Sequence, residues 1–172
     1  MFDFAGYFEN IARKLKAIGH TDSQKHFFRS TQAVHPEELL KQGSVARYPA
    51  LVIIERADGR MIDRDSDNLL TKELYAFQIL MPAADQAPDA IETVMGQCKE
   101  IYKKIVAKMI RDKKADMKVA ITMQQTGLRN LETADISYQQ IGPMGDNLYG
   151  LYVSFSIVDP AGVKFNQDDW IE

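Results

Sequence analysis

The sequence of 172 residues contains one cysteine, one tryptophan and no long apolar run. The single thiol, Cys98, excludes a disulfide within the chain. It falls on the apolar face of a predicted helix, where we expect it to pack as a small hydrophobic side chain. No stretch of about twenty apolar residues is present, so we expect no membrane insertion. The segment after Met1, FDFAGYFENIARK, has charges within each apolar cluster, so we expect no signal peptide and a cytoplasmic protein.

An excess of charge of one sign is also missing. The 21 basic and 24 acidic residues give a net charge of −3. This weak acidity predicts neither general attraction to nucleic acid nor disorder through self-repulsion. The hydrophobic content of 45% is that of a globular protein, and the length fits one domain. We therefore expect a single domain over residues 1–172, with residues 159–172 as an extended C-terminal tail.

Several catalytic and cofactor motifs are missing as well. The run Gly142-Pro143-Met144-Gly145 has neither the P-loop lysine nor the spacing of a dinucleotide fingerprint, and it joins two predicted strands. No G-x-S-x-G elbow exists, and Ser154 and Ser156 lie inside a predicted strand. We expect no catalytic residue, no cofactor and no enzymatic activity.

Two groups of side chains resemble metal ligands in part. The loop at residues 63–68, DRDSDN, places three carboxylates at alternate positions, as the start of a calcium loop does. Asn68 stands where that loop needs glycine and Leu74 where it needs glutamate, which favours a solvated acidic turn. The second group is His20, Asp22, His26 and His35, whose spacing matches no zinc motif. We expect loop and capping roles for these side chains, and no bound metal.

The most regular pattern lies between Pro88 and Lys114. Its apolar residues recur every three or four positions, which predicts one face of a long α-helix. They are Ile91, Val94, Met95, Cys98, Ile101, Tyr102, Ile105, Val106, Met109 and Ile110. A first helix is predicted after Asp3, which can cap it, with Gly19 placed to end it in a left-handed conformation. Residues 20–34 show no clean period, and a short helix is predicted for PEELLKQ at residues 36–42.

Five further segments have the composition or alternation of strands. The predicted strands are Ala50–Arg56, Glu73–Met81, Met117–Gln124, Thr133–Ile141 and Leu148–Val158. Asp58-Gly59 predicts a hairpin turn after the first strand, and residues 142–147 predict a hairpin loop between the last two. Strands on either side of one long helix favour an α+β domain. We expect a mostly antiparallel sheet of about five strands, with the long helix and the N-terminal helix packed on one face.

Positive charge is concentrated in the second half of the long helix. Lys99, Lys103, Lys104, Lys108, Arg111, Lys113 and Lys114 are opposed there only by Glu100 and Asp112. Cations near a helix C-terminus complement its dipole, so a solvated polar face explains part of this pattern. We predict an interaction surface that includes Lys103, Lys104, Lys108 and Arg111. Tyr152, on the half-exposed side of the last predicted strand, is a further candidate.

The order of elements, together with the closing segment ISYQQIGPMGDNLYGLYVSFSIVDP, resembles the tail-completion proteins of bacteriophages and prophages. That group includes the tail-terminator family, α+β proteins that form rings at the head-proximal end of a tail tube. The resemblance is one of layout, from the N-terminal helix to the last hairpin, where Gly142 to Val158 looks like the family's closing hairpin. It implies a homo-oligomeric ring with tail-tube or head-completion proteins as partners, and a virion component. It assigns no functional residue.

Our leading hypothesis is therefore a non-enzymatic structural subunit of a phage or prophage tail or neck. A second hypothesis is a small-molecule-binding domain or uncharacterised enzyme with a pocket between the helices and the sheet. A third is a nucleic-acid-associated protein that uses the basic end of the helix at residues 88–114. The net acidity and the lack of interleaved aromatic residues favour the first hypothesis over the third.

Overall fold

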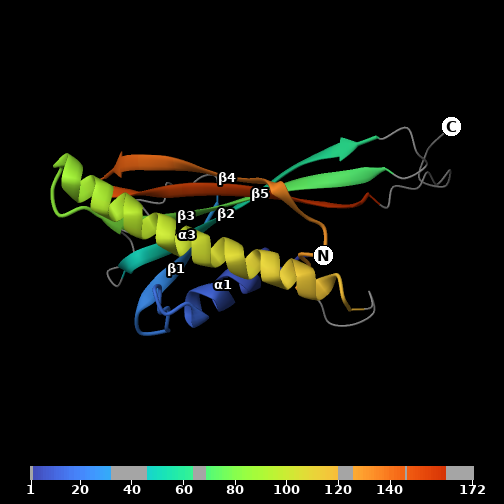
Figure 1. Ribbon diagram of the computed structural model, residues 1–172, viewed down its shortest axis with the longest axis horizontal. Coiled ribbons are helices and arrows are strands. Elements are labelled where there is room, and N and C mark those ends of the chain that lie inside the picture. The colour runs from blue at the N-terminus through green and yellow to red at the C-terminus, as the bar shows by residue number, and fades with distance from the viewer. Residues whose placement is uncertain (1, 32–45, 64–68, 120–125, 146, 162–172) are drawn as a thin grey trace.

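The computed structural model describes residues 2–31, 46–63, 69–119, 126–145 and 147–161 (Figure 1). Within these ranges the chain forms α1 (Phe4–Lys14), β1 (Lys25–Ser30), β2 (Ala46–Ile62), β3 (Leu70–Pro82), α3 (Pro88–Asp116), β4 (Leu131–Met144) and β5 (Leu148–Pro160).

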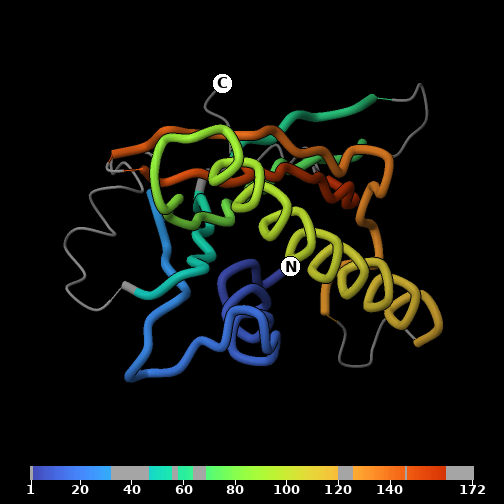
Figure 2. Tube along the Cα trace, turned by 60° about the vertical axis from the view of Figure 1, so that its left-hand side comes forward, coloured from blue at the N-terminus to red at the C-terminus, as the bar shows by residue number. Residues whose placement is uncertain are grey.

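The strands form one five-stranded sheet in the order β1-β2-β3-β5-β4. β1 pairs with β2 in parallel, and the other three pairs are antiparallel. Both helices lie on the same face of this sheet (Figures 1 and 2). The predicted α+β fold, with a mostly antiparallel sheet and helices on one face, is confirmed.

The main core lies between that face and the two helices. Alternate residues of β2, β3 and β5 point toward the helices, as a strand period of two requires. Phe8 of α1 meets Phe77 of β3 at 4.8 Å between ring centroids and Phe155 of β5 at 6.0 Å, and all three are fully buried. A smaller cluster on the opposite face contains Ala50, Val52, Leu80 and Leu148.

α1 begins where its sequence predicts but ends earlier, at Lys14, before the predicted stop at Gly19. The Asp3 carboxylate accepts a hydrogen bond from the Gly6 amide at 2.9 Å, which satisfies a free donor of the first turn. After the helix, Gly19 adopts φ +68° and its amide donates to the Leu15 carbonyl at 2.9 Å. Glycine is favoured there because a left-handed backbone is costly for other residues.

α3 runs for 29 residues and carries Pro88 in its first turn. Cys98, Ile105 and Met109 on its apolar face are fully buried. Burial raises the pKa of the Cys98 thiol to about 12, so the group stays protonated. The predicted packing role of Cys98 is confirmed.

The predicted hairpin turn at Asp58-Gly59 is wrong. β2 continues through these residues, with Asp58 opposite Leu74 and Gly59 opposite Glu73 of β3. The register shifts between Ile54 and Asp58, so Asp58-Gly59 directly follows a bulge within a long strand. Bulges and hairpin turns favour similar residues, which explains the error.

Four further predictions have different outcomes. β1 lies in the region predicted to be irregular. The strand was not predicted because the adjacent apolar residues in KHFFRS hide the alternation of a strand. The strand predicted at Met117–Gln124 is wrong at residues 117–119, which form a turn after α3, and residues 120–124 lie outside the described residues. The predicted helix at residues 36–42 lies outside them too. The last hairpin is confirmed, although β4 extends to Met144 and shortens the loop.

Candidate interaction surface

A slot of about 240 Å³ opens between α1 and α3. Its floor is apolar and consists of Ile11, Leu15 and Ile105, and its rim carries Lys14, Lys104 and Lys108. Asn10 also lines it. The slot exists because residues four apart lie on one helix face, which aligns Ile11 with Leu15 and Lys104 with Lys108.

A buried polar contact holds the two helices together beside the slot. The Tyr7 hydroxyl of α1 donates a hydrogen bond of 2.8 Å to the Asp112 carboxylate of α3. Lys108 forms an ion pair with the same carboxylate, and its ammonium lies 6.0 Å from the centre of the Tyr7 ring. Burial raises the pKa of Tyr7, and the hydrogen bond to Asp112 raises it further. Tyr7 therefore remains a neutral donor that fixes the helices.

The solvent side of α3 is more uniformly basic than the sequence indicates. Asp112, counted there as an opposing charge, turns inward and is 7% exposed, so that part of the expectation is corrected. Glu100 remains on the outside and pairs with Lys103 at 2.7 Å between Nζ and Oε1. Arg111 and Lys114 lie further along, on a shallow surface that also includes Ala107 and Ile110.

The five candidate residues occupy three different places. Lys104 and Lys108 border the slot, whereas Lys103 and Arg111 lie further around the exposed side of α3. Tyr152 lies on the other face of the sheet, because it alternates with Leu151 and Val153, which belong to the core beneath the helices. The structure thus brings together Lys104, Lys108 and Lys14, and places Tyr152 apart from them.

An edge strand forms a second candidate surface. Among the described residues β4 pairs with β5 alone, and most of its residues are intermediate or exposed. Tyr138 is 45% exposed, and its ring lies 5.0 Å from that of Tyr102 on α3. Lys14 of the slot was not predicted as a site, because the meeting of two helices is a tertiary feature.

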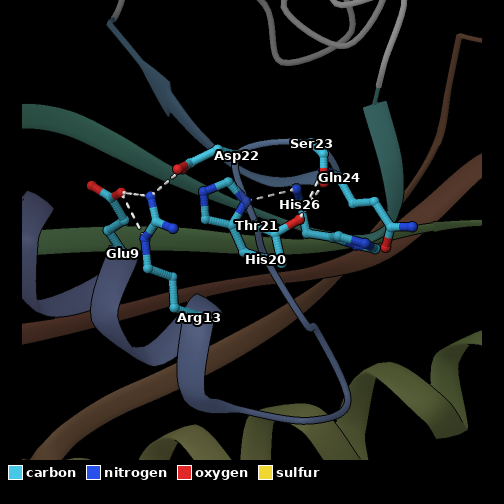
Figure 3. Close-up of polar contacts among 8 residues, drawn as sticks. All are labelled: Glu9, Arg13, His20, Thr21, Asp22, Ser23, Gln24 and His26. Atoms are coloured by element: carbon cyan, nitrogen blue, oxygen red, sulfur yellow. Dashed lines mark hydrogen bonds and ion pairs between the residues drawn. The ribbon is translucent and has the colours of Figure 1, made fainter.

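The side chains considered as zinc ligands have structural partners (Figure 3). His20 Nδ1 accepts a hydrogen bond from the His26 amide at 3.1 Å, and His26 Nδ1 lies 2.9 Å from the Pro49 carbonyl. Asp22 pairs with Arg13 at 2.7 Å, and Glu9 pairs with the same guanidinium. Burial, followed by the charge of Arg13, lowers the pKa of His20. This arrangement ties the end of α1 to the start of β1.

Across the described residues no group of three His, Cys, Asp or Glu side chains is placed to hold a metal ion. His35 lies outside those residues, as do five of the six positions of the acidic loop, residues 64–68. No helix in the described ranges is both long and apolar enough to cross a lipid bilayer. No protein-family model matches the sequence, and no curated protein matches it.

Proposed function

We propose that the protein is a non-enzymatic subunit of a homo-oligomeric ring, of the kind that completes a phage or prophage tail or neck. The observation that carries this proposal is the composition of the edge strand β4. An edge strand presents unpaired amide and carbonyl groups, which can pair with a strand of another chain. Proteins that stay monomeric usually protect such an edge with lysine, proline or a covering element.

β4 has little of this protection where it is most regular. The stretch Ile136–Ile141, ISYQQI, contains no charge and no proline, and Ser137 through Gln140 are exposed. Its residues have the β-branched, aromatic and amide side chains that favour pairing between strands. The charges of β4, Glu132 and Asp135, lie closer to its start, beside a shift in register between Glu132 and Ser137. A second subunit can therefore add a strand along residues 136–141.

The observed fold agrees with the layout that the resemblance to tail-completion proteins implies, with the β4–β5 hairpin as the closing element. Sites for small molecules usually measure about 300–1,000 Å³ and are concave. The slot measures about 240 Å³, and the larger hollows beside α3, of about 490–520 Å³, are more open to solvent. These shapes favour assembly over the small-molecule alternative. Partners in a ring would be further copies of the chain, and then tail-tube or head-completion proteins.

The experiment places charge on the edge. We expect the wild-type chain to give a discrete oligomer by light scattering and a ring by negative-stain electron microscopy. The double variant Gln139→Lys/Gln140→Lys should shift the population toward monomer while keeping the circular dichroism of the wild type, because both side chains are exposed. The matched control is Gln97→Lys, which adds a lysine at an exposed position of α3. A wild-type chain that is monomeric at every concentration would contradict the proposal.

A further inference from the structure

We propose that the slot between α1 and α3 binds residues 168–172, Asp-Asp-Trp-Ile-Glu, of a second copy of this chain. The inference rests on the proposed homo-oligomer and names one of its contacts. The juxtaposition behind it is an apolar floor, Ile11, Leu15 and Ile105, beneath three ammonium groups on the rim.

The slot has the features of a docking site. Its floor residues Ile11 and Ile105 are 5% and 0% exposed, so they are fixed within the core. A volume of about 240 Å³ admits one large side chain with its immediate neighbours. Within the described part of the chain, neither Lys14 nor Lys104 forms an ion pair, whereas Lys108 shares the Asp112 carboxylate. The rim therefore carries uncompensated positive charge around apolar surface.

Residues 168–172 are a short segment of complementary chemistry outside the described elements. Residues 168–172 hold three carboxylates and no base, and Trp170 and Ile171 lie between them. Trp170 is the single tryptophan of the chain. Tryptophan side chains are frequent anchors in protein interfaces, where a pocket removes them from water and charged groups surround them. The acidic loop at residues 63–68 offers no large apolar side chain, and residues 36–42, PEELLKQ, contain a lysine and no aromatic side chain.

The slot lies within reach of the chain's own C-terminal segment as well as that of a neighbour. β5 ends near the C-terminal end of α3, because Asp159 accepts from Asn130 at 2.8 Å and Leu128 donates to Asp116 at 3.0 Å. Lys104 lies twelve residues before Asp116, a distance of about 18 Å along the helix. Ten residues after Pro160 span at most about 35 Å, about twice that distance, so the chain's own Trp170 also has the reach to enter the slot. The proposed homo-oligomer supplies the segment of a neighbour as well, and the concentration dependence of docking distinguishes the two.

Each contact of this kind is weak when considered alone. Exposed lysine–carboxylate pairs contribute little and are screened by salt. In a closed ring every subunit gives one segment and receives another, so the second and later contacts form at a high effective concentration. The docked segment would thus add to the β4 contact without replacing it.

Trp170 provides a direct measurement in the full-length protein, because its fluorescence reports its own environment. We expect the wild-type emission to be blue-shifted and protected from acrylamide, and to shift to the red on dilution as the oligomer dissociates. The variant Lys14→Glu/Lys104→Glu should give exposed-tryptophan emission at every concentration. Both lysines are exposed, so the variant should keep its fold, which circular dichroism checks. The matched control Lys114→Glu, also exposed on α3, should behave as the wild type.

A charge exchange makes the test specific. Adding Asp168→Lys/Asp169→Lys to the Lys14→Glu/Lys104→Glu variant should restore the blue shift and at least half of the acrylamide protection. Failure of this restoration, or wild-type emission that is exposed at all concentrations, would overturn the inference. A blue shift independent of concentration would assign the segment to its own subunit and would also overturn it. A third outcome would assign the slot to an anionic amphiphile and overturn the inference. In it, Trp170 is exposed in the wild type, and the Trp170→Ala variant binds decanoate. Adding Lys14→Glu/Lys104→Glu then abolishes that binding.

Light scattering on the same samples separates the two proposals. An oligomer that persists while Trp170 is exposed overturns the slot contact and leaves the proposed function intact. A wild-type chain that stays monomeric overturns both.

Discussion

β4 and β5 are consecutive strands of 14 and 13 residues, but they differ sharply in burial. β5 lies between β3 and β4, and most of its residues are buried. β4 is the edge strand, and only Leu131 at its start is buried. The position of a strand within the sheet, and not its length, therefore decides how much of it is buried.

The two strands also differ in the contacts that they make with neighbouring elements. β5 packs aromatic and branched side chains beneath the helices, and its Phe155 stacks on Tyr75 of β3 at 5.4 Å between ring centroids. β4 contacts α3 through Tyr138 and through its Leu131 carbonyl, which accepts from Lys113. This comparison can be tested by equivalent changes in the two strands.

The largest expected effect comes from truncating one aromatic residue in each strand. Phe155→Ala should lower the free energy of unfolding by about 3–5 kcal/mol, because it leaves a cavity among fully buried rings. Tyr138→Ala should lower it by less than about 1 kcal/mol, because its ring is 45% exposed. Urea unfolding of both variants measures the difference. Equal losses would show that β4 contributes to the core as β5 does.

A smaller loss is expected from a single methyl group in β5. A Cβ on Gly150 would lie 1.8 Å from the Ile79 carbonyl oxygen of β3, so the two strands would have to move apart. Gly150→Ala should destabilise the protein by about 1–3 kcal/mol in the same assay. The matched control is Gly96→Ala on α3, where nothing lies within 4 Å, and it should gain about 0.5–1 kcal/mol from helix propensity. A tolerated Gly150→Ala would mean that β3 and β5 are less closely packed than described.

Local patterns account for much of the fold. The helical period between Pro88 and Lys114 is long enough to predict α3 almost to its ends, and Asp3 marks the start of α1, whereas Gly19 lies beyond the end of α1 at Lys14. β1 was missed because its burial depends on pairing with β2, which no local pattern encodes. The error at Asp58-Gly59 has the same origin, since the partner strand β3 decides between a turn and a bulge.

The candidate site was predictable only in part. Lys104 and Lys108 follow from the charge pattern of one helix, and both border the slot. Lys14 and Leu15 belong to a different helix, and their place beside Ile105 depends on how α1 and α3 pack. The inward turn of Asp112 is likewise a product of packing, because the Tyr7 hydroxyl on the facing helix donates a hydrogen bond to its carboxylate.

The smallest expected effect concerns the polar link between the two strands. Asp135 of β4 pairs with Lys72 of β3 and accepts a hydrogen bond from Ser156 of β5. The pair with Lys72, followed by that hydrogen bond, lowers the pKa of Asp135 in the folded protein. The unfolded chain therefore binds this proton more readily, so the contribution is present above the unfolded pKa of about 3.9 and is lost as pH falls below it.

Asp135→Asn should accordingly cost less than about 1 kcal/mol at pH 7, since the pair is partly exposed. The difference from wild type should shrink as pH is lowered from about 5 to 3. Urea unfolding at several pH values measures this change. A difference that stays constant over that range would show that the charge of Asp135 contributes nothing to the link.

The strand order has a consequence for the way the chain reaches this structure. β4 and β5 form a local hairpin, whereas β3 and β5 pair although all of α3 and β4 lie between them in the sequence. Closing a long loop delays such pairing, because the ordering entropy is lost before the contacts form. The β4–β5 hairpin can therefore form early, with the edge of β5 that β3 later covers still open. During that interval the partly folded chain has two unpaired strand edges, and it would be most prone to aggregate with other copies of the chain.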